Sequence, residues 1–513
     1  MASPNIHMLT TKLIITNKTA LQQKYGETHQ QILDDLTALQ AFDNNRHLDA
    51  HIIFIDDPVQ MQACQATPVT DNTDDAQNKK AIDDLYRFYS PGYLLLIGAQ
   101  DIIPFQRLKN LLPGDNDPDG NIPSDLPYAC DTPYDTDPGK FISPTRVVGR
   151  LPDIPAVNDP SYLHTLITNI LIASPAQPGD YQPYFSLSTF DWQDSTQNSL
   201  KNIFGNHNSL LVFPGDATLT GTNWTAAQLQ AKTHFINCHG AINNPAYYGQ
   251  KAGDFPLALR SDGITNKITP GTIVAAECCY GGQLFDPKKN SAKRMSMANS
   301  YLLNHALAFV GSSNIAYGPP TGQGLADLLT QFFVINVLNG ASTGRALLEA
   351  RQRFLHEMGP TLDPYELKTA AQFYLLGDPS WQPVINQKDP STTDAEQPFV
   401  NTLQNRRDNL EARGKMLDNF IAVPHPADDT HATDPALHTA MHQLLDEKNF
   451  AKARAPKIFV NRKKNHTDGN SMPSVKFHVF SESATIGEIP LTKVVVVKEK
   501  NNQILGYREY VSR

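Results

Sequence analysis

Two short segments of the sequence end an apolar run with a residue type used in catalysis and follow that residue with glycine. Residues 235–240 (FINCHG) contain His239, and residues 274–282 (VAAECCYGG) contain Cys279. A free thiol has an ordinary pKa of about 8.5, so it needs a neighbouring base or cation to react as a thiolate at neutral pH. An imidazole can be that base. The two segments therefore indicate a cysteine nucleophile paired with a histidine.

The runs before these residues explain how a fold would bring them together. Residues 233–238 and 272–276 are apolar runs typical of buried strands in a parallel sheet. His239 and Cys279 then follow the carboxyl ends of two strands, where open α/β sheets place their ligand sites. Cys278 points to the opposite side of an extended chain and is expected in the core. The alternative is that both cysteines are small buried hydrophobic residues.

Composition excludes several classes of protein. The chain has 513 residues, 40% of them apolar, and a formal net charge of −9, which argues against nucleic acid as a partner. No apolar run is long enough to predict a membrane span, and the first residues show no basic-then-apolar signal pattern. Five cysteines are few and odd in number, so no disulfide framework is expected. We expect a cytoplasmic protein, with export by a non-classical route left open.

Strand and helix patterns alternate along most of the chain. Apolar strand-like runs alternate with helical stretches, which indicates βαβ units and a mostly parallel sheet. The strand-like runs in the first part of the chain are residues 13–15, 51–56 and 93–98, and the helical stretches are residues 25–42 and 81–89. The sequence thus predicts an α/β fold, a three-layer α/β/α sandwich.

Four parts of the chain are predicted. Residues 1–175 form an N-terminal α/β subdomain, and residues 176–386 form the catalytic subdomain. Residues 387–456 are more polar and are expected to be a helical linker. Residues 457–513 are rich in strand-forming residues, with a turn at Asn501-Asn502, and predict a small C-terminal β module.

These motifs resemble the caspase-like (clan CD) cysteine peptidases. A strand ending in His-Gly followed by a strand ending in Glu-x-Cys-x-Gly is their pattern, and residues 277–282 (ECCYGG) are similar to the legumain and metacaspase version. Over about residues 80–385 the chain is most similar to the gingipain family. The segments that carry this resemblance are residues 124–128 (SDLPY), 147–152 (VVGRLP), 307–313 (LAFVGSS) and 376–380 (LGDPS).

The resemblance implies a role for each residue of the candidate site. Cys279 becomes the nucleophile and His239 the general acid or base, while the amides of Gly240 and Cys279 form the oxyanion hole. Gingipains also place a carboxylate beside the histidine, but the matching residues 144–147 (PTRV) contain no acid. A Cys-His dyad is therefore expected.

Glu277 is the candidate specificity residue. In metacaspases and clostripain, an acid two residues before the cysteine lines the primary pocket and pairs with Arg or Lys. A carboxylate binds a guanidinium with two parallel hydrogen bonds, which suits this role. Legumains carry the same Glu and prefer Asn, so basic specificity stays one of two interpretations. A Glu that caps the following turn is the structural alternative.

Two charged segments suggest further sites. Residues 286–294 (DPKKNSAKR) lie where caspase-like peptidases are often cut during activation, so self-cleavage there is a hypothesis beside that of a solvated basic loop. Asp115, Asp117 and Asp119 alternate as in a calcium loop, and gingipains bind calcium. The spacing lacks the final Glu of such a loop, so an acidic turn is the alternative.

The sequence as a whole predicts a cysteine endopeptidase that acts on a protein or peptide substrate and needs no cofactor for its chemistry. An activating partner is left open. Two rival functions remain: a catalytically inactive caspase-like scaffold, and a partner-binding protein in which the β module makes the contact. Unreactive thiols would favour the first, and apolar surface patches on residues 457–513 would favour the second.

Overall fold

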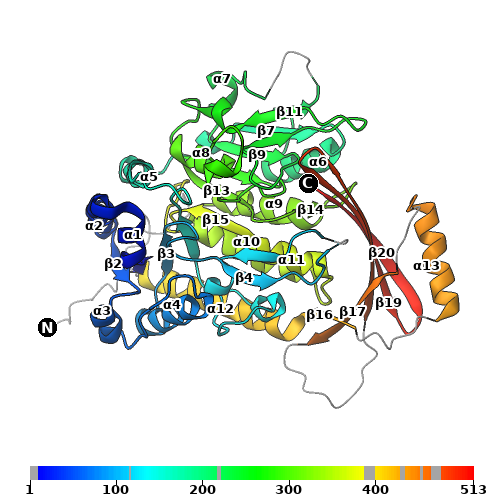
Figure 1. The fold of residues 1–513 in the computed structure, drawn as a ribbon, viewed down its shortest axis with the longest axis horizontal. Coiled ribbons are helices and arrows are strands. Elements are labelled where there is room, and N and C mark those ends of the chain that lie inside the picture. Colours follow the sequence, from blue (N-terminus) through cyan, green and yellow to red (C-terminus); the bar gives the residue numbers. More distant parts are fainter. Residues whose placement is uncertain are drawn as a thin grey trace.

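The protein is built on a ten-stranded sheet with a second, six-stranded sheet at one side (Figure 1). The computed structural model describes residues 10–114, 117–215, 221–385, 399–427, 434–450, 455–463 and 475–513. No helix in these ranges is long and apolar enough to cross a membrane.

The large sheet consists of two parallel blocks. Its strand order is β2-β1-β3-β6-β15-β13-β12-β9-β7-β8, and every neighbouring pair is parallel except β15 and β13. The strands of the first block are β1 (Thr10–Thr16), β2 (Leu48–Phe54), β3 (Tyr93–Ile97), β6 (Val148–Leu151) and β15 (Phe373–Gly377). Those of the second are β7 (Tyr184–Thr189), β8 (Leu210–Phe213), β9 (Thr233–Asn237), β12 (Thr272–Ala276) and β13 (Ala306–Ser312). The carboxyl ends of the two blocks therefore lie at opposite edges of the sheet.

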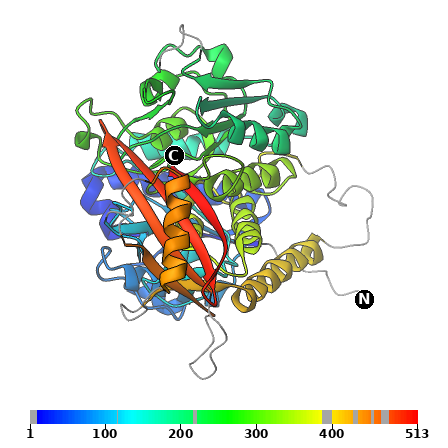
Figure 2. The same cartoon turned by 90° about the vertical axis from the view of Figure 1, so that its right-hand side faces the viewer.

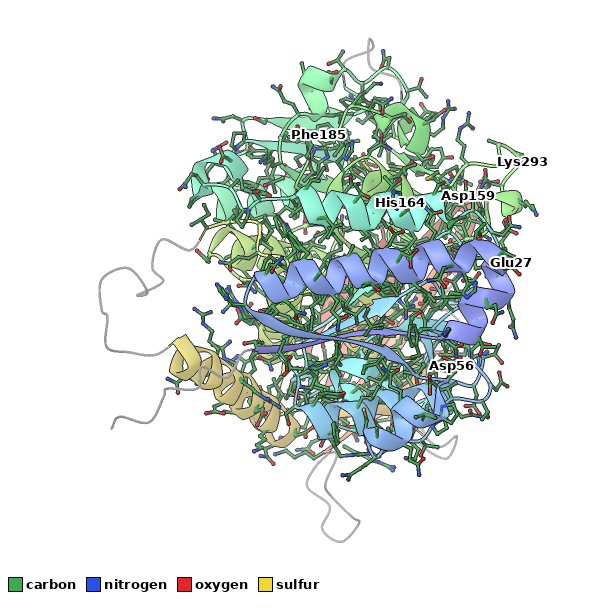
Figure 3. The ribbon with its side chains drawn as sticks, turned by 90° about the vertical axis from the view of Figure 1, so that its left-hand side faces the viewer. Glu27, Asp56, Asp159, His164, Phe185 and Lys293 are labelled. Carbon is green, nitrogen blue, oxygen red and sulfur yellow. The ribbon has the colours of Figure 1, made fainter. Side chains whose placement is uncertain are left out.

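Helices cover both faces of this sheet. On one face, α2 (His29–Asn45) and α5 (Ser161–Ile172) run side by side (Figure 3), joined by a 2.8 Å pair between His164 and Asp35. The other helices before residue 310 are α1 (Lys18–Tyr25), α3 (Pro58–Ala63), α4 (Asp75–Tyr89), α6 (Gln193–Phe204), α7 (Ala226–Leu229) and α8 (Met297–Leu303). The opposite face packs against α9 (Leu325–Leu338), α10 (Thr343–Met358) and α11 (Pro364–Gln372).

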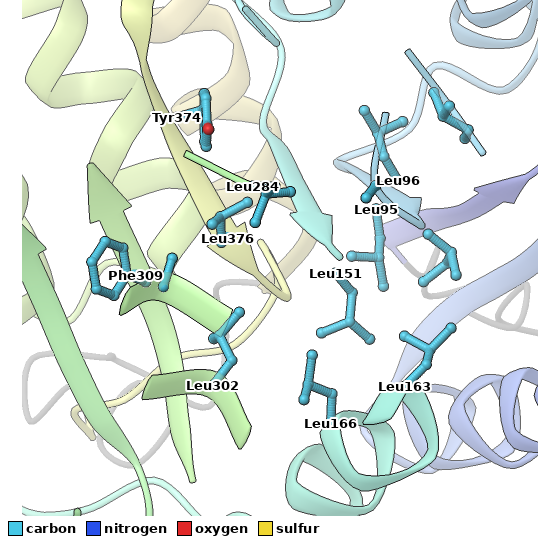
Figure 4. Packing of buried hydrophobic residues seen from close by; sticks show 14 of the residues in the cluster. Leu95, Leu96, Leu151, Leu163, Leu166, Leu284, Leu302, Phe309, Tyr374 and Leu376 are labelled. Atoms are coloured by element: carbon cyan, nitrogen blue, oxygen red, sulfur yellow. The ribbon is translucent and has the colours of Figure 1, made fainter. Parts of the chain in front are cut away.

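Side-chain alternation divides the core into two clusters. In β12, Val274 and Ala276 belong to the cluster on the α2 and α5 side, whereas Ile273 and Ala275 belong to the cluster on the α9 and α10 side. This is the period of two expected of a strand buried on both faces. Figure 4 shows part of the first cluster, where leucines of the strands meet those of α5 and α8.

The second sheet contains the C-terminal strands. Its order is β14-β20-β19-β18-β17-β16, with antiparallel neighbours. The strands are β14 (Tyr317–Gly318), β16 (Ala422–Pro426), β17 (Lys457–Lys463), β18 (Lys476–Ile486), β19 (Ile489–Lys500) and β20 (Gln503–Ser512). Two short hairpins complete the strands, β4 (Gln106–Lys109) with β5 (Asn121–Ser124), and β10 (Ala246–Tyr248) with β11 (Leu257–Arg260).

The C-terminal sheet is covered on both faces. Helix α13 (Pro435–Glu447) crosses its outer face (Figure 2) and buries Leu437, Met441 and Leu445 against Phe480 and neighbouring strand residues. Its inner face contributes Phe477, Val479 and Tyr510 to the cluster that also contains α9 to α11. The sheet is therefore docked on the large domain.

Polar contacts hold this docking in place. Arg508 of β20 pairs with Glu366 of α11 and lies 3.4 Å from Asp363, and the hydroxyl of Tyr510 donates to Asp363 at 2.7 Å. Asp363 and Glu366 are buried, so these contacts lie in a poorly hydrated interface. Undocking the sheet would leave buried charges without partners, which costs free energy.

The predicted fold class is confirmed, with its mostly parallel sheet and additional C-terminal β module. The four domain boundaries stay predictions. The large sheet is continuous across residue 175, and the boundary near residue 387 lies outside the described residues. In the segment expected to be a helical linker, α12 (Phe399–Phe420) is accompanied by β16, a strand of the second sheet.

Candidate active site

Cys279 and His239 follow two neighbouring strands at the same edge of the large sheet. In the register of β12 and β9, Ala276 is paired with Ile236, and each candidate residue lies three positions after its member of this pair. Cys278 belongs to the core cluster on the α2 and α5 side and Cys279 to that on the opposite side. The two cysteines therefore face opposite sides of the sheet, and both are buried.

Gly240 makes this close approach of the two chain segments possible. A Cβ atom at position 240 would lie only 1.9 Å from the carbonyl oxygen of Cys279. Any side chain there would push the two segments apart, because backbone atoms cannot give way as a flexible side chain does. The glycine after the histidine is thus required by packing, whatever its amide does in the reaction.

His239 is oriented by a glutamine. Its Nε2 lies 2.7 Å from Oε1 of Gln250, and its backbone N–H and C=O exchange 2.9 Å bonds with Tyr248. An amide oxygen can only accept, so Nε2 carries the proton and Nδ1 keeps its lone pair. Nδ1 is buried and has no hydrogen-bond partner among the described residues. Gln250 is therefore the side chain that contacts the imidazole, whereas residues 144–147 offer no carboxylate.

Burial sets the protonation of both candidate residues. It lowers the pKa of His239 to about 4, an effect that the bond to Gln250 opposes and the positive charge of Arg513 reinforces. It also raises the pKa of the Cys279 thiol above its ordinary value. The thiol donates to the carbonyl oxygen of Ala316 at 3.5 Å. In this state the pair is a neutral thiol beside a neutral imidazole.

The end of strand β20 lies directly on Cys279. The amide of Cys279 donates to the main-chain oxygen of Arg513 at 2.9 Å, and the amide of Arg513 donates to the oxygen of Ala316 at 2.9 Å. Before it, Ser512 is paired antiparallel with Tyr317, and Val511 with Gly318. The main chain of residues 511–513 therefore lies over the candidate nucleophile, with the oxygen of Arg513 on the Cys279 amide.

The side chain of Arg513 is buried beside the candidate residues, in what is here called the arginine pocket, formed by Asp327, Pro319, Gly318 and Trp192. Its Nη2 lies 3.0 Å and 3.1 Å from the two carboxylate oxygens of Asp327 and donates to the oxygen of Pro319 at 3.0 Å. Its Cζ lies 4.6 Å from the centre of the Trp192 ring, within the range of a cation–π contact. Arg513 and Asp327 are both fully buried. The pocket is therefore built for a cation.

Two residues shape the walls of this pocket. A Cβ at Gly318 would lie 2.2 Å from Nε of Arg513, so only glycine leaves room for the guanidinium. The ring of Trp192 also packs against the imidazole of His239, with centroids 4.3 Å apart. The ring thus separates the pocket from the histidine and touches both.

Glu277, the predicted specificity residue, adjoins the pocket through Asp327. Its Oε1 accepts from Thr330 at 3.3 Å, and Oε2 has no partner among the described residues. Burial, and next the neighbouring Asp327 carboxylate, raise the pKa of Glu277 well above its ordinary value and so favour its protonated form. The ion pair with Arg513 belongs to Asp327, a residue that the sequence did not single out.

The predicted calcium residues are engaged by a lysine. Asp115 lies outside the described residues, while Asp117 and Asp119 both pair with the buried Lys368 of α11, Asp119 at 2.6 Å. The described residues contain no cluster of metal-ligand side chains suited to an ion. Asp119 also accepts from the hydroxyl of Tyr280 at 2.7 Å and thereby supports the residue after Cys279. The calcium site stays a prediction.

The basic loop of residues 286–294 lies at the surface. Lys288, Lys289 and Lys293 are exposed, and Figure 3 places Lys293 at the edge of the molecule. Arg294 pairs with Asp262 at 3.0 Å. An exposed loop is open to a peptidase, but this geometry is equally that of a solvated loop.

The fold, with a histidine and a cysteine at the edge of its sheet, defines the class of caspase-like cysteine peptidases. Residues 13–384 match the model of Peptidase family C25, and the chain belongs to this family. It is therefore a cysteine-type endopeptidase of the gingipain type, with a protein or peptide as substrate. Comparison with curated proteins finds no match.

Proposed function

We propose that the protein hydrolyses peptide bonds through a Cys279–His239 dyad. The Cys279 thiolate attacks the carbonyl carbon of the scissile bond, and the amides of Cys279 and Gly240 bind the oxyanion that forms. His239 then protonates the leaving amine, and water hydrolyses the thioester. Gln250 orients the imidazole and keeps Nδ1 available to accept and return the proton.

One observation carries this proposal. A main-chain carbonyl oxygen, that of Arg513, accepts from the Cys279 amide at 2.9 Å while the same residue donates to Ala316. An acyl-transfer enzyme must hold its substrate in this way, with the carbonyl next to the nucleophile and the chain fixed on both sides. An inactive scaffold has no need of such a strand-binding arrangement.

We further propose that cleavage follows basic residues. The pocket beside Cys279 holds a guanidinium against Asp327, with Glu277 adjoining it. A buried carboxylate without a cation is costly, so substrates that bring a positive charge are favoured over those that end in Asn or Asp. The second acceptor at Pro319 and the face of Trp192 suit the planar guanidinium and favour Arg over Lys.

Self-processing within residues 286–294 belongs to the same proposal. The loop offers lysines and an arginine at the surface, and an enzyme with basic specificity could cut a second copy of itself there. Intact-mass measurement of the purified protein during substrate cleavage tests this. Only intact chain at the end of the reaction would contradict self-processing and leave the peptidase activity unaffected.

The test uses fluorogenic peptides that end in Arg, Lys, Asn or Asp. The protein and its Cys279→Ala and Arg513→Ala variants are assayed with each peptide. We expect hydrolysis after Arg, weaker hydrolysis after Lys, and none with Cys279→Ala. Cleavage that survives in Cys279→Ala, or no cleavage by any variant with any peptide, would contradict the proposal.

A further inference from the structure

The substrate cleft is occupied by the chain itself. We propose that the groove along β14 is a binding site for an extended peptide ending in Arg, and that residues 509–513 of β20 are its built-in ligand, which must leave before a substrate can enter. This inference rests on the proposed peptidase function. It adds the class of peptide that the cleft binds and the element that controls access to it.

The backbone contacts are those of a bound peptide. Arg513 is fixed through both of its main-chain groups, to Ala316 and to Cys279, and Ser512 and Val511 continue an antiparallel ladder with β14. β14 contains only two residues and has no other strand partner in the sheet order. A short strand at a sheet edge offers its free backbone groups to an added strand, which is how many proteins bind extended peptides.

The side-chain contacts hold a buried cation through Nη2 of Arg513, whereas its Nε and Nη1 have no hydrogen-bond partner among the described residues. Arg513 is fully buried, and its ion pair with Asp327 is backed by a hydroxyl bond from Ser195 to the same carboxylate at 2.9 Å. Arg513 is the only cation paired with Asp327 among the described residues. Withdrawing the strand without a replacement would leave Asp327 buried and unpaired, so an incoming peptide must supply a cation of its own.

The hairpin before β20 reaches the other side of the catalytic pair. Glu488, at the turn between β18 and β19, accepts from Asn244 at 2.6 Å, and Asn244 lies in the loop that follows Gly240. The turn, Tyr248 and residues 253–255 line an open hollow of about 440 Å³, with Phe255 and Ile489 among its walls. Phe255 packs on His239, with centroids 5.2 Å apart. The C-terminal module thus contacts the site from two directions.

The occupied state is also poorly suited to chemistry. The strand excludes water from both catalytic residues, and burial favours the neutral thiol and the neutral imidazole. Departure of residues 509–513 would hydrate Cys279 and His239 and bring both groups closer to their ordinary titration ranges. Strand release therefore opens the cleft and prepares the nucleophile in the same step.

The occupant can be removed by one substitution. Arg513→Ala deletes the guanidinium and leaves the rest of the module, so the strand should no longer compete with substrate. We expect kcat/KM for an Arg-ending peptide to rise by at least about 10-fold, because the measured rate is scaled by the fraction of molecules with an open cleft. Alkylation of Cys279 by iodoacetamide, followed by mass spectrometry, should accelerate in parallel.

Two controls make the result specific. Lys493→Ala removes an exposed cation from the adjacent strand β19 and should leave both rates unchanged. The free peptide Glu-Tyr-Val-Ser-Arg should inhibit Arg513→Ala competitively, and the same peptide ending in Ala should not. Thermal unfolding of each variant shows that it is folded, and Arg513→Gln replaces Arg513→Ala if the latter is not.

The outcomes separate this inference from the proposed function. If Arg513→Ala cleaves and is alkylated no faster than the unmodified chain, or if the free peptide does not inhibit, the built-in ligand is refuted while the peptidase stands. If no variant cleaves any peptide, the proposed function fails, and faster alkylation of Cys279 alone would still support an occupied cleft. Faster cleavage, faster alkylation and competitive inhibition together support both.

Discussion

The guanidinium of Arg513 lies against the carboxylate of Asp327, with Nη2 3.0 Å from Oδ1 and 3.1 Å from Oδ2. The two residues are 186 positions apart in the chain and meet only because β20 adds to β14. This pair joins helix α9, the segment around Cys279 and the C-terminal module into one structural unit. The predictions below follow from it.

The two carboxyl groups of the pocket are expected to differ in importance. In an Arg513→Ala background, Asp327→Asn should lower kcat/KM for Arg-ending peptides by roughly 100-fold, because loss of a buried ion-pair partner costs ~2–5 kcal/mol. Glu277→Gln should cost less than about 10-fold, because the raised pKa of Glu277 favours its neutral form and an amide is also neutral. Steady-state kinetics with Arg and Lys peptides measures both. A larger loss of kcat/KM for Glu277→Gln than for Asp327→Asn would show that Glu277, and not Asp327, supplies the negative charge of the pocket.

Gln250 is expected to act on the reaction through the orientation of His239. Gln250→Ala should lower kcat by about 10- to 100-fold with little change in KM, as is typical of partners that orient a functional histidine. Gln250→Glu should restore part of the rate and shift the acidic limb of the pH profile to higher pH, since a carboxylate stabilises the imidazolium.

The matched control for Gln250 is Gln62→Ala on α3, which removes an exposed glutamine far along the chain from the site. If Gln250→Ala changes KM and kcat equally, or if Gln250→Glu leaves the pH profile unmoved, Gln250 does not position the imidazole.

The protonation of His239 should report whether the cleft is occupied. Burial lowers its pKa from 6.5 to about 4 in the occupied state. Because the pKa is lowered, burial of His239 favours the neutral imidazole. The stability that this residue gives to the strand-bound state is therefore fully present above pH 6.5 and is lost as pH falls from 6.5 toward 4. Acid therefore favours release of the strand through this residue.

Nuclear magnetic resonance of histidine-labelled protein tests this directly. In the unmodified chain His239 should stay neutral at pH 5.5, whereas in Arg513→Ala its midpoint should move up, because water enters and the facing guanidinium is gone. The described groups that face the ring are Gln250, Trp192, Phe255 and Arg513. Equal midpoints in the two proteins would show that Arg513 does not bury the imidazole.

A chain that carries additional residues after Arg513 is expected to be cut slowly at that point, because in the occupied state the thiol is neutral and water reaches the site only when the strand loosens. The carbonyl of Arg513 lies on the Cys279 amide, so the thiolate would attack its carbon and the bond to the next nitrogen would break. His239 would protonate the released amine, and water would hydrolyse the thioester to a free carboxylate on Arg513. Intact-mass measurement of a protein with a peptide tag after Arg513 should show loss of the tag.

The same tagged protein with Cys279→Ala serves as the control and should keep its tag. A dilution series distinguishes cleavage within one molecule from cleavage between copies, because only the former has a rate independent of concentration. Retention of the tag at every concentration would show that Arg513 is bound as a ligand and is not placed for attack.

The local parts of this site could be predicted from the sequence. Apolar runs before His239 and Cys279 identified two neighbouring strands, and their parallel pairing puts both residues at one edge of the sheet. The alternation that separates Cys278 from Cys279 follows from strand geometry alone. These features depend on a few consecutive residues and on a general rule about sheet edges.

The remaining parts depend on contacts that no local pattern encodes. Asp327 is an ordinary acid in the first turn of α9, and Gln250 lies in an irregular loop after β10. Their roles follow from which elements pack on the sheet edge. Arg513 reaches the site only through the register of β20 on β14, a strand of two residues that carries no periodic signal.

An active-site probe tests the central claim most directly. Arg513→Ala is treated with a peptide acyloxymethyl ketone ending in Arg, which alkylates a thiol only when that thiol is the nucleophile beside an occupied specificity pocket, and the adduct is located by mass spectrometry. The account predicts a single adduct on Cys279, slower formation in the unmodified chain, and loss of the adduct in Arg513→Ala with Asp327→Asn. An adduct on Cys238 or Cys278, or none on Cys279, would contradict it.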